Sequence, residues 1–190
     1  MGALIELGYK HRPKELIIFD LPPEEQYWGK PKFPQDRDYE FNWGILKYIH
    51  GRIENIHDYR QLDGKRFDCV FMGQVIEHIL PDQLHIVLKW IREHLKENGK
   101  FIFDTPNRII TRIQSPDKLI DEDHKYEYTP GELEKILNLN GFKVVKKTGI
   151  LAMPGTFHSK NFNPLEAYET ELVNDNPDVS YLFAFECAKA

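Results

Sequence analysis

Two histidines stand beside acidic residues in a pattern that suits proton transfer. His78 directly follows Glu77, and His124 lies within the run DEDHKYEY. A neighbouring carboxylate can orient an imidazole as a general base, so both histidines are candidates for activating an oxygen nucleophile. Other interpretations stay open. The Glu77–His78 pair can instead cap a helix or orient a cofactor, and His124 can be a loop histidine held by local hydrogen bonds.

Alternating strands and helices are needed to position these residues. Short apolar runs predict strands at Glu15–Phe19, Leu46–His50, Phe67–Met72, Lys100–Asp104, Phe142–Lys147 and Ser180–Cys187. Helical spacing predicts a helix over Pro81–Asn98 with Gly99 as its C-cap, and Thr129-Pro130 with Glu132 predicts the capped start of another. Ala3–Lys10 is expected to be helical, and Glu24–Asn42 to be irregular or a lid.

This order of elements indicates an α/β fold. We expect a mostly parallel sheet with helices on both faces, in which the last two strands form an antiparallel hairpin at one edge. Asp104, Thr105 and Asn107 then follow a strand at its carboxyl end, on the side expected to face a substrate. We expect residues 1–190 to form a single domain, with 24–45 as a lid or insertion.

Composition excludes several classes of protein. Hydrophobic residues make up 41% of the 190 residues and charged residues 29%, which is typical of a globular chain. The formal net charge of −5 argues against a broad nucleic-acid surface. No apolar run is long enough to cross a membrane and no signal peptide is evident, so we expect a cytoplasmic protein. Cys69 and Cys187 are expected to be reduced core thiols.

Three segments together resemble the class I S-adenosylmethionine (SAM) methyltransferases. They are FDCVFMGQVIEHI, HLKENGKFIFDTPNR and HKYEYTPGELEKILNLNGFKV. The chain is similar to the small-molecule group that includes the ubiquinone-biosynthesis type. The resemblance covers roughly Glu15–Lys147 and implies a Rossmann-like fold with SAM as cofactor.

The resemblance also implies where SAM binds, because ligands of open α/β sheets lie outside the carboxyl ends of the strands. Asp20 would accept the ribose hydroxyls. The Gly51–Glu54 loop would lie along the adenine, although Arg52 stands where the family often has Asp. Gly73 would let the backbone approach the methionine part. The expected cofactor-binding residues are Gly2, Asp20, Leu21, Ile53, Glu54, Gly73, Gln74 and Val75.

The family's first strand and its glycine-rich loop have no counterpart in the sequence, which begins MGALIELGYK. Gly2–Gly8 looks like the tail of that loop. Three explanations stay open. The sequence is truncated at its N-terminus, or SAM is bound by other groups or by a second subunit of a homodimer, or the chain is a binding module without catalysis.

The leading hypothesis is methyl transfer from SAM to an oxygen of a small molecule, with His78 or His124 as the base and no metal. One alternative is methylation of RNA. Glu77, His78 and His124 match the metal ligands of the RNA 3′-terminal 2′-O-methyltransferases, but Gln74 stands where their first glutamate is expected. That exchange weakens a site for a hard cation, which prefers carboxylate oxygens.

Overall fold

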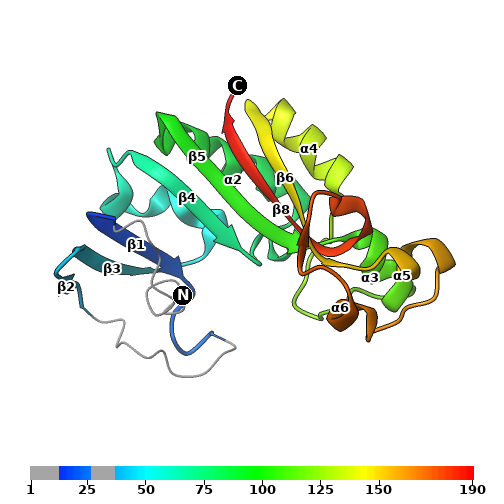
Figure 1. Ribbon diagram of the computed structural model, residues 1–190. Helices are drawn as coiled ribbons and strands as arrows, with labels where there is room; N and C mark the ends of the chain where they lie inside the picture. The colour runs from blue at the N-terminus through cyan, green and yellow to red at the C-terminus, as the bar shows by residue number, and fades with distance from the viewer. Residues whose placement is uncertain (1–12, 27–36) are drawn as a thin grey trace. The chain divides into compact units, whose positions relative to one another are not determined.

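The computed structural model describes residues 13–26 and 37–190. The chain divides into two compact units, Met1–Asp63 and Gly64–Ala190 (Figure 1). The predicted helix Ala3–Lys10 and the proposed cofactor contact Gly2 lie outside the described residues.

The first unit contains a three-stranded sheet in the order β1-β3-β2. Strands β1 (Glu15–Asp20) and β3 (Gly44–His50) run parallel, as predicted, and β2 (Tyr39–Phe41) pairs with β3 in the antiparallel direction. The expectation that Glu24–Asn42 is irregular throughout is therefore wrong at β2. Its aromatic–Glu–aromatic alternation suits a strand, and the Phe41 ring stacks on Trp43 with centroids 5.0 Å apart. Two 3₁₀ turns follow β3: η1 (Ile53–Asp58) and η2 (Arg60–Leu62).

The second unit contains a five-stranded sheet in the order β4-β5-β8-β6-β7. Its strands are β4 (Phe67–Gly73), β5 (Leu95–Pro106), β6 (Phe142–Ala152), β7 (Val173–Asn174) and β8 (Ser180–Lys189). Strands β4 and β5 run parallel, whereas β8 lies between β5 and β6 and is antiparallel to both (Figure 1). The predicted α/β class is confirmed. The predicted antiparallel pairing of Phe142–Lys147 with Ser180–Cys187 is also confirmed, as the pairing of β6 with β8.

Phenylalanines fill the core beside this sheet. Phe101, Phe103, Phe183 and Phe185 are almost completely buried, and Phe103 and Phe185 lie with ring centroids 5.6 Å apart. Helix α2 (Pro81–His94) buries Leu84, Val87, Leu88 and Ile91, which is the face that the sequence spacing predicts. Full burial of each such side chain contributes about 1.5–3 kcal/mol to stability. Helix α4 (Pro130–Leu139) packs along β6 (Figure 1).

Helix α2 ends four residues earlier than predicted, at His94 rather than Asn98. Leu95 is already extended and pairs with Phe67 of β4. Gly99 is therefore a strand residue and not a helix C-cap. A Cβ at Gly99 would lie 2.9 Å from the Phe67 carbonyl oxygen, so glycine permits the close approach of β4 and β5 beside the bulge between Phe67 and Cys69.

The two cysteines differ in exposure. Cys187 is a buried free thiol, as predicted, but Cys69 is exposed. Strand β4 pairs only with β5 in the described sheet, so its side chains are less covered than those of an inner strand. The prediction that Cys69 is a core residue is wrong for this reason.

Asn107 anchors the segment between β6 and β8 to the rest of the second unit. This segment carries α5 (Pro154–Ser159), α6 (Glu166–Glu169) and η4 (Pro177–Val179), and it gathers near α3 (Arg108–Gln114) (Figure 1). The Asn107 amide donates to the carbonyls of Pro177 and Ser180 at 3.0 and 2.9 Å, and its Oδ1 caps α3 at Ile109 N. Asn107 is completely buried, so the expectation that it faces a substrate is wrong.

The capping box of α4 gives a direct test of the sequence-to-structure argument. Thr129 Oγ1 accepts from Glu132 N, and the Glu132 carboxylate accepts from Thr129 N. We expect Thr129→Ala to lower the free energy of unfolding by about 1 kcal/mol, because it leaves the Glu132 N–H without its side-chain acceptor. Thr129→Ser keeps the hydroxyl and should stay close to wild type in urea denaturation. Equal losses in both variants would show that the cap is not what stabilises α4.

Candidate functional site

The turn after β4 brings the chain across the end of β5. Gln74 has φ = 53°, in the left-handed region that non-glycine residues rarely adopt. Its N–H donates to the Asp104 carbonyl at 3.1 Å, and its side-chain amide donates to the Asp104 carboxylate at 2.5 Å. Gly73 is crowded: a Cβ would lie 2.9 Å from the Phe71 ring. The bonds to Asp104 therefore hold the turn in place, and no side chain covers its backbone at Gly73.

Glu77 lies at the centre of the candidate site, in the 3₁₀ turn η3 (Ile76–His78), and its side chain is completely buried. Its Oε2 accepts from Thr105 Oγ1 at 2.9 Å, while its Oε1 is buried without a hydrogen-bond partner in the structure. Burial raises the pKa of Glu77 to about 7. The carboxyl group is thus poised between its neutral and charged forms near physiological pH.

Both predicted catalytic histidines lie beside Glu77. The rings of His78 and His124 meet edge to face with centroids 5.0 Å apart. One potential ligand atom from each of Glu77, His78 and His124 lies within 4.8 Å of the other two. His78 is exposed and His124 is buried, so the group, here called the Glu–His–His cluster, reaches solvent through His78.

Backbone contacts hold the His124 loop against this turn. The carbonyl of Glu77 accepts from Lys125 N at 2.7 Å and from Tyr126 N at 3.1 Å. His78 Nδ1 lies 3.3 Å from the Asp123 carbonyl oxygen, which can only accept, so Nδ1 must donate. Desolvation by burial lowers the pKa of His78. The shift favours the neutral ring, in which Nε2 carries the lone pair.

Sequence reasoning missed Glu127, which hydrogen-bonds to His124. This carboxylate is buried and accepts from Thr111 Oγ1, Ile120 N and His124 Nδ1 at 2.5, 2.9 and 2.9 Å. Burial alone would raise the pKa of Glu127, but these hydrogen bonds hold it below its usual value. The spacing of three residues between His124 and Glu127 was the available signal, and the surrounding acidic run obscured it.

The predicted cofactor residues of the first unit lie at one edge of its sheet. Asp20 ends β1 opposite His50, the last residue of β3, and Gly51 N donates to the Asp20 carbonyl at 2.9 Å. The exposed Asp20 carboxylate accepts from Leu21 N through Oδ1. Within residues 13–26 and 37–190, its other oxygen accepts no backbone hydrogen bond, which fits an acceptor for the ribose hydroxyls.

The adenine loop is built on the same edge. Ile53 and Glu54 begin η1 and are half-buried. Arg52 stands where the family often has Asp. It forms an ion pair with Glu25 at 2.5 Å, so its charge at this edge is paired. A Cβ on Gly51 would overlap the Tyr59 ring, which explains the glycine at this position. The donor and acceptor set present here fits a nucleoside.

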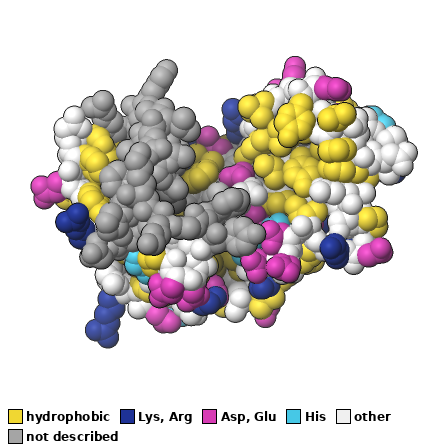
Figure 2. Space-filling model, turned by 90° about the horizontal axis from the view of Figure 1, so that it is seen from below, with side chains coloured by type: hydrophobic (Ala, Val, Ile, Leu, Met, Phe, Trp, Pro, Cys, Tyr) yellow, Lys and Arg dark blue, Asp and Glu magenta, His cyan; other side chains and the backbone are white. Residues whose placement is uncertain are grey.

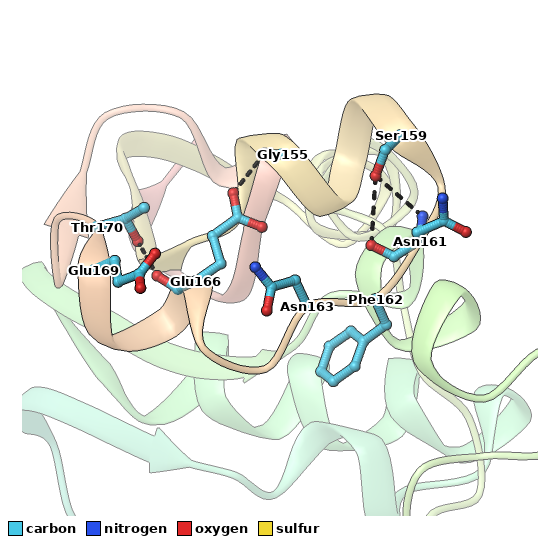
Figure 3. A pocket seen from close by; sticks show the side chains of 8 residues that line it. All are labelled: Gly155, Ser159, Asn161, Phe162, Asn163, Glu166, Glu169 and Thr170. Atoms are coloured by element: carbon cyan, nitrogen blue, oxygen red, sulfur yellow. Dashed lines mark hydrogen bonds between the residues drawn. The ribbon is translucent and has the colours of Figure 1, made fainter.

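A separate pocket of about 640 Å³ lies in the segment before β8 (Figure 3). Eight residues between Gly155 and Thr170 line it, most of them polar. The Glu166 carboxylate in its wall accepts from Gly155 N and Thr156 N, at 2.5 and 2.8 Å. No member of the Glu–His–His cluster lines this pocket. The Glu166 carboxylate is already hydrogen-bonded to N–H groups at the start of α5, so we assign the pocket no part in the chemistry.

The raised pKa of Glu77 predicts an unusual dependence of stability on pH. Between pH 4.5 and about 7 the folded chain keeps a proton that the unfolded chain releases. The stability from this group is therefore complete at low pH and is lost as the pH rises through 7, by roughly 3 kcal/mol. Urea denaturation with a chelator present at pH 5 and pH 8 should show this loss in wild type but not in Glu77→Gln. The matched change at an exposed carboxylate, Glu122→Gln, should keep it, and a loss that persists in Glu77→Gln would contradict the assignment.

Comparisons with known proteins identify the family and the fold of the chain. A family model described as a methyltransferase domain matches residues 2–147, which is more than half of the chain and spans both units. No curated protein sequence matches significantly.

Solved structures show the same fold. The chain is similar to a SAM-dependent methyltransferase of Thermotoga maritima, described as a possible histamine N-methyltransferase, with 18% identity, a TM-score of 0.57 and coverage of 76% of this chain and 64% of that one. A SAM-dependent methyltransferase of Archaeoglobus fulgidus gives 17% identity, a TM-score of 0.54 and coverage of 75% and 67%. The chain thus spans about two thirds of the length of these proteins. Because the family match extends across both units, the chain belongs to the methyltransferase domain family.

Proposed function

We propose that the chain transfers a methyl group from SAM to an oxygen atom of a small-molecule acceptor, which binds beside the Glu–His–His cluster. The observation that carries this proposal is the edge-to-face contact of the two predicted catalytic histidines, His78 in the turn after β4 and His124 in the loop before α4. When bound, SAM supplies a methyl carbon that its sulfonium already makes electrophilic. The protein then has to position the two reactants and remove a proton.

His78 is the better placed proton acceptor. It is exposed, so an acceptor hydroxyl can reach it, and burial of part of the ring keeps it neutral. Its Nδ1 is held by the Asp123 carbonyl, which leaves the Nε2 lone pair for a proton. His124 packs against it as the second base candidate.

We further propose that residues 1–190 form one methyltransferase domain, with cofactor-binding residues in each unit. The family match across both units supports this. In the first unit Asp20 and Leu21 would hold the ribose, and Ile53 with Glu54 would border the adenine. In the second unit the backbone at Gly73, Gln74 and Val75 would pass the methionine part. All these residues lie at or just beyond the carboxyl ends of strands, where α/β sheets bind ligands.

A small organic acceptor fits the surface better than nucleic acid. The net charge is −5, and on the face shown in Figure 2 the described Lys and Arg side chains are scattered among acidic ones. Nucleic-acid binding draws on clustered positive charge.

Among the described residues, no helix combines the length and apolar character needed to cross a membrane.

Calorimetric titration with SAM and a transfer assay with tritiated SAM together test the proposal. Asp20→Ala should weaken SAM binding about 10- to 100-fold, because it removes hydrogen bonds to a charged acceptor worth about 1.5–3 kcal/mol. His78→Ala should bind SAM as wild type does and lower the rate of transfer to a panel of phenols and sugars about 100-fold. Glu24→Ala and His85→Ala are the matched exposed controls. Unchanged SAM affinity in Asp20→Ala would contradict the cofactor assignment, and unchanged transfer in His78→Ala would contradict the role of His78 as the base.

A second candidate is metal-dependent methylation, as in the RNA 2′-O-methyltransferases. The specific observation is that Glu77 Oε1 is buried without a hydrogen-bond partner among the described residues, and that the ligand atoms of the cluster lie within 4.8 Å of one another. A carboxylate and two imidazoles suit a divalent transition metal ion. Gln74 does not replace the absent glutamate, because its amide is bonded to Asp104.

Loss of the free Mn²⁺ signal in electron paramagnetic resonance measures this directly. If the second candidate holds, wild type binds one Mn²⁺, Glu77→Gln weakens that binding at least about 10-fold through loss of the charged ligand, Glu122→Gln leaves it unchanged, and Mn²⁺ supports methylation of a short RNA. Absence of binding by folded wild type would eliminate this candidate and leave the first proposal standing.

A further inference from the structure

The buried carboxylate of Glu127 connects three parts of the second unit. Its Oε2 accepts from Thr111 in α3. Its Oε1 accepts from Ile120 N and from His124 Nδ1, both in the loop between α3 and α4. Its side chain is 1% exposed to solvent. A carboxylate buried with three donors is restricted in position, so it fixes whatever it binds.

These contacts decide which nitrogen of His124 carries the proton. The Ile120 N–H can only donate, and an ionised carboxylate has no proton to give. The close contact of 2.9 Å between His124 Nδ1 and Glu127 Oε1 therefore requires that Nδ1 donate. In the neutral ring the lone pair is then on Nε2. A free histidine in water prefers the opposite tautomer, with the proton on Nε2, so the protein selects the less common form.

The same carboxylate sets where the ring lies. The loop that carries His124 is tied to the Glu77 carbonyl through Lys125 N and Tyr126 N, and Glu127 ties it to α3. The His124 ring then meets His78 edge to face. Without Glu127, the loop keeps its backbone bonds to Glu77, but nothing else described bonds to His124 Nδ1 to select the tautomer.

We propose that Glu127 is a positioning residue, which holds His124 as the Nδ1–H tautomer and so directs the Nε2 lone pair into the Glu–His–His cluster. A histidine whose second nitrogen is fixed in this way serves equally as a proton acceptor or as a metal ligand. The inference deepens the proposed function by adding a residue to its site, and it rests on that function only for the importance of His124.

Nitrogen-15 spectroscopy of the full chain at pH 8.5 reads the tautomer without any acceptor or cofactor. The His124 ring signals are assigned by their absence in His124→Gln. In wild type, Nδ1 should resonate as a protonated nitrogen and Nε2 as an unprotonated one. Glu127→Gln can still accept from Nδ1 through its amide oxygen and should keep this pattern. Glu127→Met offers no acceptor, so the pattern should reverse towards the Nε2–H tautomer. His78, held by the Asp123 carbonyl, is the internal control.

Three outcomes would overturn the proposal: wild-type His124 as the Nε2–H tautomer, loss of the wild-type pattern in folded Glu127→Gln, or retention of it in folded Glu127→Met. Circular dichroism melting checks folding, and if Glu127→Met does not fold, wild type and Glu127→Gln still decide. The readout is independent of catalysis. A chain that shows the Nδ1–H tautomer but binds no SAM would contradict the proposed function and leave this inference intact.

Discussion

The burial of Glu77 is the constraint on which the candidate site depends. Complete removal of a carboxyl group from water is costly unless the group is protonated or paired. Here one oxygen of Glu77 accepts from Thr105, while the other has no hydrogen-bond partner in the part of the chain that the structure describes. This buried carboxyl group lies in the turn after β4. The backbone carbonyl of the same residue also accepts hydrogen bonds from the loop that carries His124. One residue thus joins the ends of β4 and β5 to the second histidine.

The chemistry follows from that arrangement. Both imidazoles have Nδ1 engaged by an acceptor, the Asp123 carbonyl for His78 and the Glu127 carboxylate for His124. In its neutral form each ring therefore carries its lone pair on Nε2, and the carboxyl group of the same cluster has a pKa of about 7. Such a cluster can take up a proton or hold a cation, and each of these can activate a hydroxyl acceptor.

The sequence predicted strands β1, β3, β4, β5, β6 and β8 and the capping box of α4, because periodicity and capping are local signals. It also named His78 and His124 as separate candidates, without predicting that they meet. It failed where tertiary contacts decide. Pairing of Leu95 with β4 shortens α2, and three carbonyl acceptors turn Asn107 into an anchor. The role of Glu127 depends on Thr111 and Ile120, which no local pattern connects to it. Burial of Glu77 without a second partner is likewise a property of the assembled fold.

The central claim is that the Glu–His–His cluster adjoins the methionine end of the cofactor. The most direct measurement is the change in the histidine ring resonances when the chain is saturated with S-adenosylhomocysteine, the product of methyl transfer. The account predicts that the signals of His78 and His124 shift, whereas those of His85 and His94 on α2 do not. Saturable binding that leaves both cluster histidines unchanged would contradict it.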